Sequence, residues 1–162
     1  MAGRRSGVAE PGSGRGRARG RRGVSRSAEA ARFDAVRLRP GEDLRQALEA
    51  RFARSGAAAG AVIACAGSLT RAVLRYADRD EGTEVPGPLE IVSLSGTLSP
   101  DGPHLHLAVS DRDGAMRGGH LLAGCEVRTT AEVVLWLGGD MVFAREPDEV
   151  TGARELVVTR PG

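Results

Sequence analysis

The chain has 162 residues, a length that fits one domain and leaves little room for a second hydrophobic core. Hydrophobic residues make up 41% and charged residues 27%, as in ordinary globular proteins, but aromatic residues make up only 3%, so the core has to be aliphatic. No apolar run approaches the roughly 20 residues of a membrane-spanning helix, so we expect no membrane partner.

The net charge of +2 conceals an uneven distribution along the chain. Residues 1–32 hold nine arginines against Glu10 and Glu29, about +7, which leaves about −5 on the remaining residues. Large apolar side chains are almost absent from this segment, so it cannot bury enough surface to offset the entropy of ordering. We predict a disordered Arg/Gly-rich tail over residues 1–32 and a folded domain over residues 33–160.

The first predicted elements of the folded domain are a strand and a helix. Residues 33–38 alternate apolar and polar side chains, as in a strand, and Pro40 and Gly41 end it. Acidic Asp43 suits the start of a helix and Gly56 suits its end. The apolar residues that recur every four positions form its predicted buried face: Leu44, Leu48 and Phe52.

The rest of the chain has mainly strand character. Residues 61–66 form a continuous apolar run that predicts a buried strand, ended by Gly67 and Ser68, with residues 71–76 as its antiparallel neighbour. Further segments of strand composition, separated by turn signals, are residues 89–96, 104–110 and 126–137, and residues 155–159 are expected to add a last edge strand. Six or seven strands in hairpin order with one clear helix predict an α+β fold with a small, mostly antiparallel sheet.

All three histidines of the chain fall within 17 residues. On a strand, His104 and His106 point to the same face while Leu105 points to the core, and the glycine pair before His120 permits a close backbone approach. Three imidazoles with an open fourth position suit a zinc ion. The alternative is that these histidines are only the polar face of a half-exposed sheet.

Several segments closely resemble the plants and prokaryotes conserved (PPC) domain, bacterial type. They are GPHLHLAVSD (102–111), GGHL (118–121), GCEVRTTAE (124–132), LSGTL (94–98) and ACAGSL (64–69). The resemblance covers about residues 33–158. It implies a homotrimer on an α/β core, and a metal held by His104, His106 and His120. Acetolactate decarboxylase, in the same fold group, holds zinc through a similar pattern. Zinc is the expected cofactor, with copper, nickel or iron as alternatives.

An enzyme would also need an acid or base, and Glu132 is the candidate. Glu132 shares one face of its strand with Arg128 and Thr130, a face that could meet the metal. The alternative is a cross-strand Arg–Glu pair on a solvated or subunit-facing surface. No serine or cysteine nucleophile is paired with a histidine in a recognisable motif.

The tail suggests a nucleic-acid partner. Its sequence GRGRARGRRG (14–23) partly resembles an AT-hook, an element that plant PPC proteins carry ahead of this domain, but Ala18 stands where that pattern needs proline. A segment of about +7 attracts polyanions through phosphate contacts. The candidate DNA-contacting residues are Arg15, Arg17, Arg19, Arg21 and Arg22. The alternative is an extension without a function.

Two isolated cysteines, Cys65 and Cys125, favour reduced thiols and a cytoplasmic location. The sequence as a whole predicts a homotrimeric, zinc-binding, non-catalytic module that associates with DNA through its tail. The alternative function is a zinc-dependent lyase or hydrolase acting on a small oxygenated metabolite.

Overall fold

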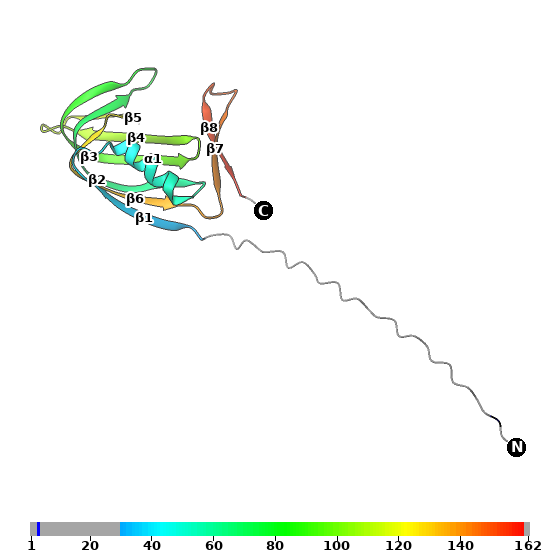
Figure 1. Cartoon of the computed structure of the whole chain (residues 1–162). Helices are drawn as coiled ribbons and strands as arrows, with labels where there is room; N and C mark the ends of the chain where they lie inside the picture. Colours follow the sequence, from blue (N-terminus) through cyan, green and yellow to red (C-terminus); the bar gives the residue numbers. More distant parts are fainter. Residues whose placement is uncertain (1–2, 4–29, 161–162) are drawn as a thin grey trace.

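The computed structural model describes residue 3 and residues 30–160 (Figure 1). Most of the predicted tail over residues 1–32 therefore lies outside the described residues. Arg32, which that prediction included in the tail, is the first residue of strand β1.

Helix α1 (Leu44–Ser55) begins and ends as the sequence predicts. The Asp43 side chain caps its first turn by accepting a hydrogen bond from the Gln46 backbone N–H at 2.9 Å. Gly56 ends the helix in the left-handed conformation, with φ 71°, which glycine adopts without steric cost. The residues predicted to face the core are all buried: Leu44, Leu48 and Phe52.

Eight strands account for most of the remaining described residues (Figure 1). They are β1 (Arg32–Leu38), β2 (Gly60–Arg75), β3 (Thr83–Ser99), β4 (Gly102–Ser110), β5 (Met116–Leu121), β6 (Glu126–Leu137), β7 (Val142–Pro147) and β8 (Arg154–Thr159). The first six form one antiparallel sheet in the order β1-β6-β2-β3-β4-β5, and β7 and β8 form a separate hairpin. The predicted α+β architecture with a mostly antiparallel sheet is confirmed.

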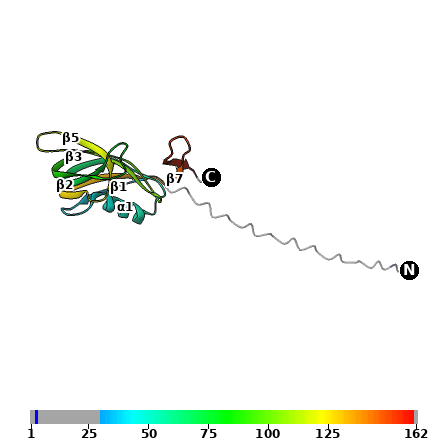
Figure 2. The same cartoon turned by 90° about the horizontal axis from the view of Figure 1, so that it is seen from above.

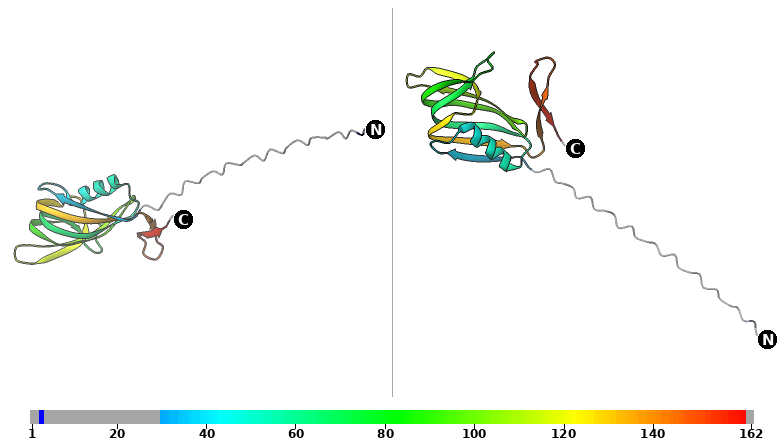
Figure 3. Two further views of the ribbon diagram at one scale, coloured as in Figure 1. Left: turned by 90° about the horizontal axis from the view of Figure 1, so that it is seen from below. Right: turned by 45° about the horizontal axis from the view of Figure 1, so that its top comes forward.

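The sheet curls so that β5 also pairs with the end of β2, where Arg75 lies opposite His120. Helix α1 covers one face of the sheet, as Figures 2 and 3 show from above and below, and the aliphatic core lies between them. The β7–β8 hairpin stands at one end of the sheet. It is anchored there by a 2.9 Å hydrogen bond from the Phe143 N–H to the Ala58 carbonyl. Within the described residues, no helix has the length and apolar character needed to cross a membrane.

The prediction of two strands over residues 61–66 and 71–76 was wrong, because β2 runs continuously through both. Gly67 is not in a turn. A Cβ atom there would collide with the Thr130 carbonyl oxygen, so glycine permits the close approach of β6. The Ser68 hydroxyl is hydrogen-bonded to that of Thr129 at 2.6 Å, which ties the two strands together at the predicted break.

The prediction from sequence also underestimated the number and the length of the strands near turn-forming residues. Strand β3 begins at Thr83, although Pro86 and Pro88 led us to place its start at residue 89. The pairing of β2 with β3 shifts register near these prolines, and an irregular ladder tolerates residues that lack an N–H donor. Strands β5 and β7 were not predicted at all, and residues 155–159 belong to the β7–β8 hairpin rather than to the edge of the main sheet.

Candidate metal centre

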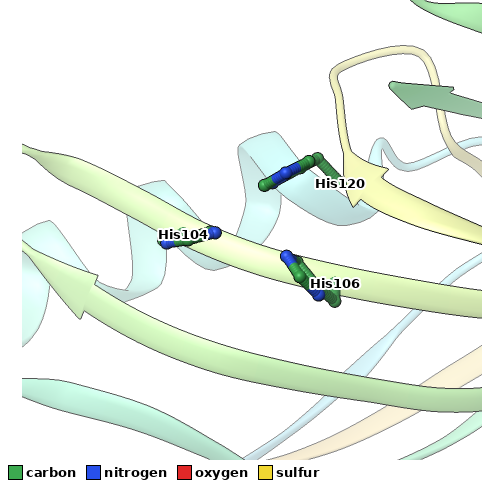
Figure 4. Close-up of side chains that lie close together, drawn as sticks. All are labelled: His104, His106 and His120. Atoms are coloured by element: carbon green, nitrogen blue, oxygen red, sulfur yellow. The ribbon is translucent and has the colours of Figure 1, made fainter. Parts of the chain in front are cut away.

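The three histidines come together on adjacent strands (Figure 4). His104 and His106 project from β4, and His106 lies directly opposite His120 of β5 in the strand register. The ring centroids are 5.2 Å apart for His104 and His106, 5.0 Å for His104 and His120, and 4.5 Å for His106 and His120. One ligand nitrogen from each residue lies within 4.8 Å of the other two.

Strand alternation turns these side chains away from the core. Leu105 and Leu107 of β4 are 3% and 1% exposed and pack in the core. His104 and His106 alternate with these leucines and therefore occupy the opposite face. Glycine brings the neighbouring backbones close. A Cβ atom on Gly96 would collide with the His104 carbonyl oxygen, and one on Gly119 would lie 2.7 Å from the Arg75 carbonyl oxygen. The glycine before His120 therefore allows β5 to reach β2. The sequence suggested a close backbone approach here but not which strand would be the partner.

The site is partly dehydrated, and this favours neutral imidazole. Burial lowers the pKa of His104 below its usual value, and the positive charge of Arg145 lowers it further. Burial also lowers the pKa of His120, with Arg75 as the next cause. Neutral imidazole is the form that binds a metal ion. In addition, Nε2 of His104 is buried with no hydrogen-bond partner in the described part of the protein.

These observations fit a metal ion better than a purely structural cluster. A buried polar nitrogen without a partner carries a desolvation cost that a coordinate bond would offset. Tetrahedral zinc with bonds of about 2.1 Å places its ligand nitrogens about 3.4 Å apart. Side-chain rotations that move the nitrogens by less than about 1 Å would bring them within that distance. The donor set, three nitrogens on one side, leaves a coordination position open for a further ligand.

A cavity of about 740 Å³ adjoins the histidines. The β7–β8 hairpin forms one of its walls, and four arginines from four different elements line it: Arg45, Arg75, Arg145 and Arg154. Sequence reasoning missed these residues. Arg75 follows buried Leu74 by strand alternation, which signals only a position outside the core. No local pattern predicts that β7 returns to the end of β3.

Glu132, the proposed acid or base, lies on β6 opposite Arg37 of β1 and Ala66 of β2. Strands β2 and β3 separate β6 from β4, a distance of about 14 Å at the usual strand spacing. Glu132 therefore does not line the histidine cavity of its own chain. It lies in a shallow depression with largely small and apolar neighbours.

The predicted DNA-contacting residues Arg15, Arg17, Arg19, Arg21 and Arg22 lie outside the described residues. The cysteines are free, and burial raises the pKa of Cys65 and of Cys125 to about 11. Cys125 is buried and Cys65 is half-buried, and the raised pKa keeps both thiols protonated near neutral pH, the form that is a poor nucleophile.

Comparison with known proteins identifies relatives of this chain. The family model for the Plants and Prokaryotes Conserved (PCC) domain matches residues 25–137. A bifunctional protein GlmU from Synechococcus sp. (strain JA-3-3Ab) is 50% identical over 126 residues, which are 77% of this chain and 20% of that protein. The chain thus spans about a fifth of the length of the curated relatives it matches.

Solved structures with the same fold include a hypothetical protein from Salmonella (TM-score 0.79, 43% identity, 81% of this chain, 95% of that chain). The metal-containing protein from Archaeoglobus fulgidus has a TM-score of 0.66 and 32% identity, covering 80% of this chain and 95% of its own. Among more distant chains of this fold, two provisionally described as DNA-binding are 20% and 21% identical.

Proposed function

Because the chain belongs to the Plants and Prokaryotes Conserved (PCC) domain family, we propose that it is a homotrimeric module that binds zinc through His104, His106 and His120 and associates with DNA through residues 1–32. The observation that carries the proposal is the histidine cluster itself. Its members converge from two strands, and the buried Nε2 of His104 has no partner within the described residues. The metal-containing relative from Archaeoglobus fulgidus, 32% identical, also supports a metal in this fold.

The residues that would hold the ion are those three histidines, and a bound zinc ion would supply a Lewis-acidic position open to one exogenous ligand. The chain's own contribution is to orient the three imidazoles by strand pairing and to lower the pKa of His104 and of His120 by partial burial, which favours their neutral form. Two carboxylates, Asp101 and Glu155, are among the described residues that line the cavity. Asp101 accepts a 2.8 Å hydrogen bond from the Arg145 backbone N–H, and Glu132, the acid or base that the sequence suggested, does not line the cavity. We propose binding rather than catalysis as the function.

The metal proposal is tested by elemental analysis of the full chain purified without chelator or added metal. We expect about one zinc per chain in the wild type and a sharp loss in His106→Ala. Ser110→Ala is the matched control, since Ser110 lies on the same strand, an even number of residues from His106 and beyond the cluster. Wild-type protein with far less than one metal per trimer, and no uptake of added zinc, would refute the proposal.

The trimer proposal rests on the family resemblance and on the outer face of the sheet. Phe33, Ile63 and Val92, from three different strands, are 71%, 56% and 47% exposed in the single chain. Apolar side chains of this size are commonly covered by a partner subunit. We expect light scattering after size exclusion to give three times the chain mass, and Ile63→Glu to lower it. Val150→Glu is the control, because Val150 is 94% exposed on the hairpin loop. A monomeric wild type at micromolar concentration would count against the assembly.

The DNA proposal rests on charge. The arginines of residues 1–32 are the dense positive cluster of the sequence, whereas the remaining residues carry about −5. Deleting residues 1–31, which keeps Arg32 of β1 in place, should abolish binding of duplex DNA and leave the circular dichroism spectrum of the domain unchanged. If five or six arginines each meet a phosphate, log K should fall with log salt at a slope of about −5. Full affinity after the deletion would show that the folded domain binds DNA instead.

A further inference from the structure

The charged residues that line the cavity beside the histidines are mainly arginines. One of the cavity's four arginines, Arg45, is paired with Glu49 at 2.9 Å. The acidic residues that line the cavity with the other three arginines are Asp101 and Glu155. Neither Arg75 nor Arg145 forms an ion pair with any residue of the described part of the chain. Such unneutralised arginines beside a cavity favour a negatively charged occupant.

Backbone and hydroxyl contacts hold two of these arginines beside the histidines. Arg145 donates a 3.0 Å hydrogen bond from Nη2 to the hydroxyl of Thr97, which is the cross-strand partner of His104. Arg75 is the cross-strand partner of His120, and its Nη1 donates to the Arg79 carbonyl at 3.3 Å. Each guanidinium therefore keeps donors that its protein contacts do not use.

The hairpin strengthens this arrangement. The Arg145 backbone N–H donates to the Asp101 carboxylate at 2.8 Å, which fixes β7 against the turn between β3 and β4. Arg154 of β8 donates to the Arg145 carbonyl through its guanidinium, so the hairpin crosslinks its own two strands at the edge of the cavity. The Asp101 carboxylate already accepts the hydrogen bond from the Arg145 N–H. Among the described residues that line the cavity, Glu155 is the acidic residue whose side chain has no hydrogen-bond partner.

We propose that the cavity between the histidines and the β7–β8 hairpin binds a small oxyanion, a carboxylate or a phosphate group, held by Arg75 beside His120 and by Arg145 beside Thr97, the partner of His104. The planar guanidinium fork matches both groups in geometry and charge. This inference rests on the proposed metal site to the extent that a zinc ion would add two positive charges and an open coordination position to the same cavity. A volume of about 740 Å³ accommodates a metabolite-sized molecule.

The test is isothermal titration of the full chain with succinate and with inorganic phosphate, at constant ionic strength set with chloride. Zinc-loaded and metal-free protein are titrated separately. We expect Arg145→Gln and Arg75→Gln each to weaken binding of the preferred anion by roughly tenfold while leaving the zinc content unchanged. Whichever probe binds more tightly identifies the carboxylate or the phosphate source.

Arg112→Gln is the matched control, because it removes the same charge from an exposed turn that does not line the cavity. Arg145→Lys keeps the charge and loses the fork, and should retain more affinity than Arg145→Gln. Equal weakening in Arg112→Gln, or unchanged affinity in both cavity variants, would overturn the proposal, as would the absence of binding of either anion to the wild type. If wild-type protein takes up no zinc but Arg145→Gln still weakens anion binding to the metal-free chain, the anion site stands and the metal site fails.

Discussion

Leu105 and His106 are chain neighbours that face opposite sides of β4, so substituting each should disturb a different property. Leu105 is 3% exposed within the aliphatic core, whereas His106 is exposed within the cluster. Leu105→Ala should leave a cavity that lowers the free energy of unfolding by about 2–5 kcal/mol. His106→Ala should change that free energy little in metal-free protein, because it removes no core contact.

Thermal unfolding converts these changes into temperatures. A folded domain of about 130 residues has an unfolding entropy near 0.27 kcal/mol/K, so Leu105→Ala should lower the midpoint by roughly 7–18 °C. Zinc at a hundred times its dissociation constant should stabilise wild type by about 2.7 kcal/mol, a rise of roughly 10 °C. The assay is a melting curve of each protein with chelator and with zinc.

We expect Leu105→Ala to melt early yet retain most of the zinc-induced rise, and His106→Ala to melt near wild type yet lose that rise. The opposite result, loss of the zinc response in Leu105→Ala and its retention in His106→Ala, would refute the assignment of the two faces of β4. A loss of both properties in each variant would mean that metal binding and folding cannot be separated at this strand, contrary to the geometry.

Three further outcomes follow from contacts elsewhere in the domain. Arg51 lowers the pKa of Asp34 through a hydrogen-bonded ion pair. The pair therefore stabilises the fold above the ordinary carboxyl pKa, and this contribution is lost as pH falls through the lowered pKa. Asp34→Asn should cost up to about 1 kcal/mol in urea melts at pH 7 and much less once the pH is below the lowered pKa. Burial raises the pKa of Cys65 to about 11, so roughly one thiol in a thousand is ionised at pH 8. Mass spectrometry should therefore show slow alkylation of Cys65 by iodoacetamide, and rapid labelling of the native protein would contradict the burial. Gly119→Ala places a methyl group 2.7 Å from a backbone carbonyl oxygen of β2, so zinc affinity and melting temperature should both fall. Both should fall less in Gly118→Ala, where the closest contact is 3.3 Å, and equal effects would argue against the close approach of β5 to β2.

Local patterns were sufficient for the elements whose residues contact one another within a short stretch of chain. The capping residues and the four-residue spacing predicted α1 closely, and the alternation of Leu105 with His104 and His106 predicted which face of β4 carries the candidate ligands. Strand β6 matches its predicted bounds of residues 126–137. In each case, the signal lies in side-chain periodicity, which the backbone geometry imposes directly.

The errors occurred where a residue serves a distant strand. Gly67 and the prolines of β3 have the composition of turns, yet Gly67 permits the approach of β6 and the prolines sit at an irregular part of the β2–β3 ladder. A glycine that ends a strand and one that admits a neighbouring backbone look alike in sequence. Only the partner strand distinguishes them.

By itself, the sequence determined an aliphatic α+β domain, a single capped helix and a strand that carries His104 and His106 on the face opposite the core. The tertiary structure decided what surrounds them. The return of β5 to β2 places Arg75 opposite His120, and the β7–β8 hairpin brings Arg145 to Thr97, 48 residues away in sequence. Contacts at such separations depend on how the sheet curls and where the hairpin is anchored, and neither is encoded in the local spacing of residues along the chain.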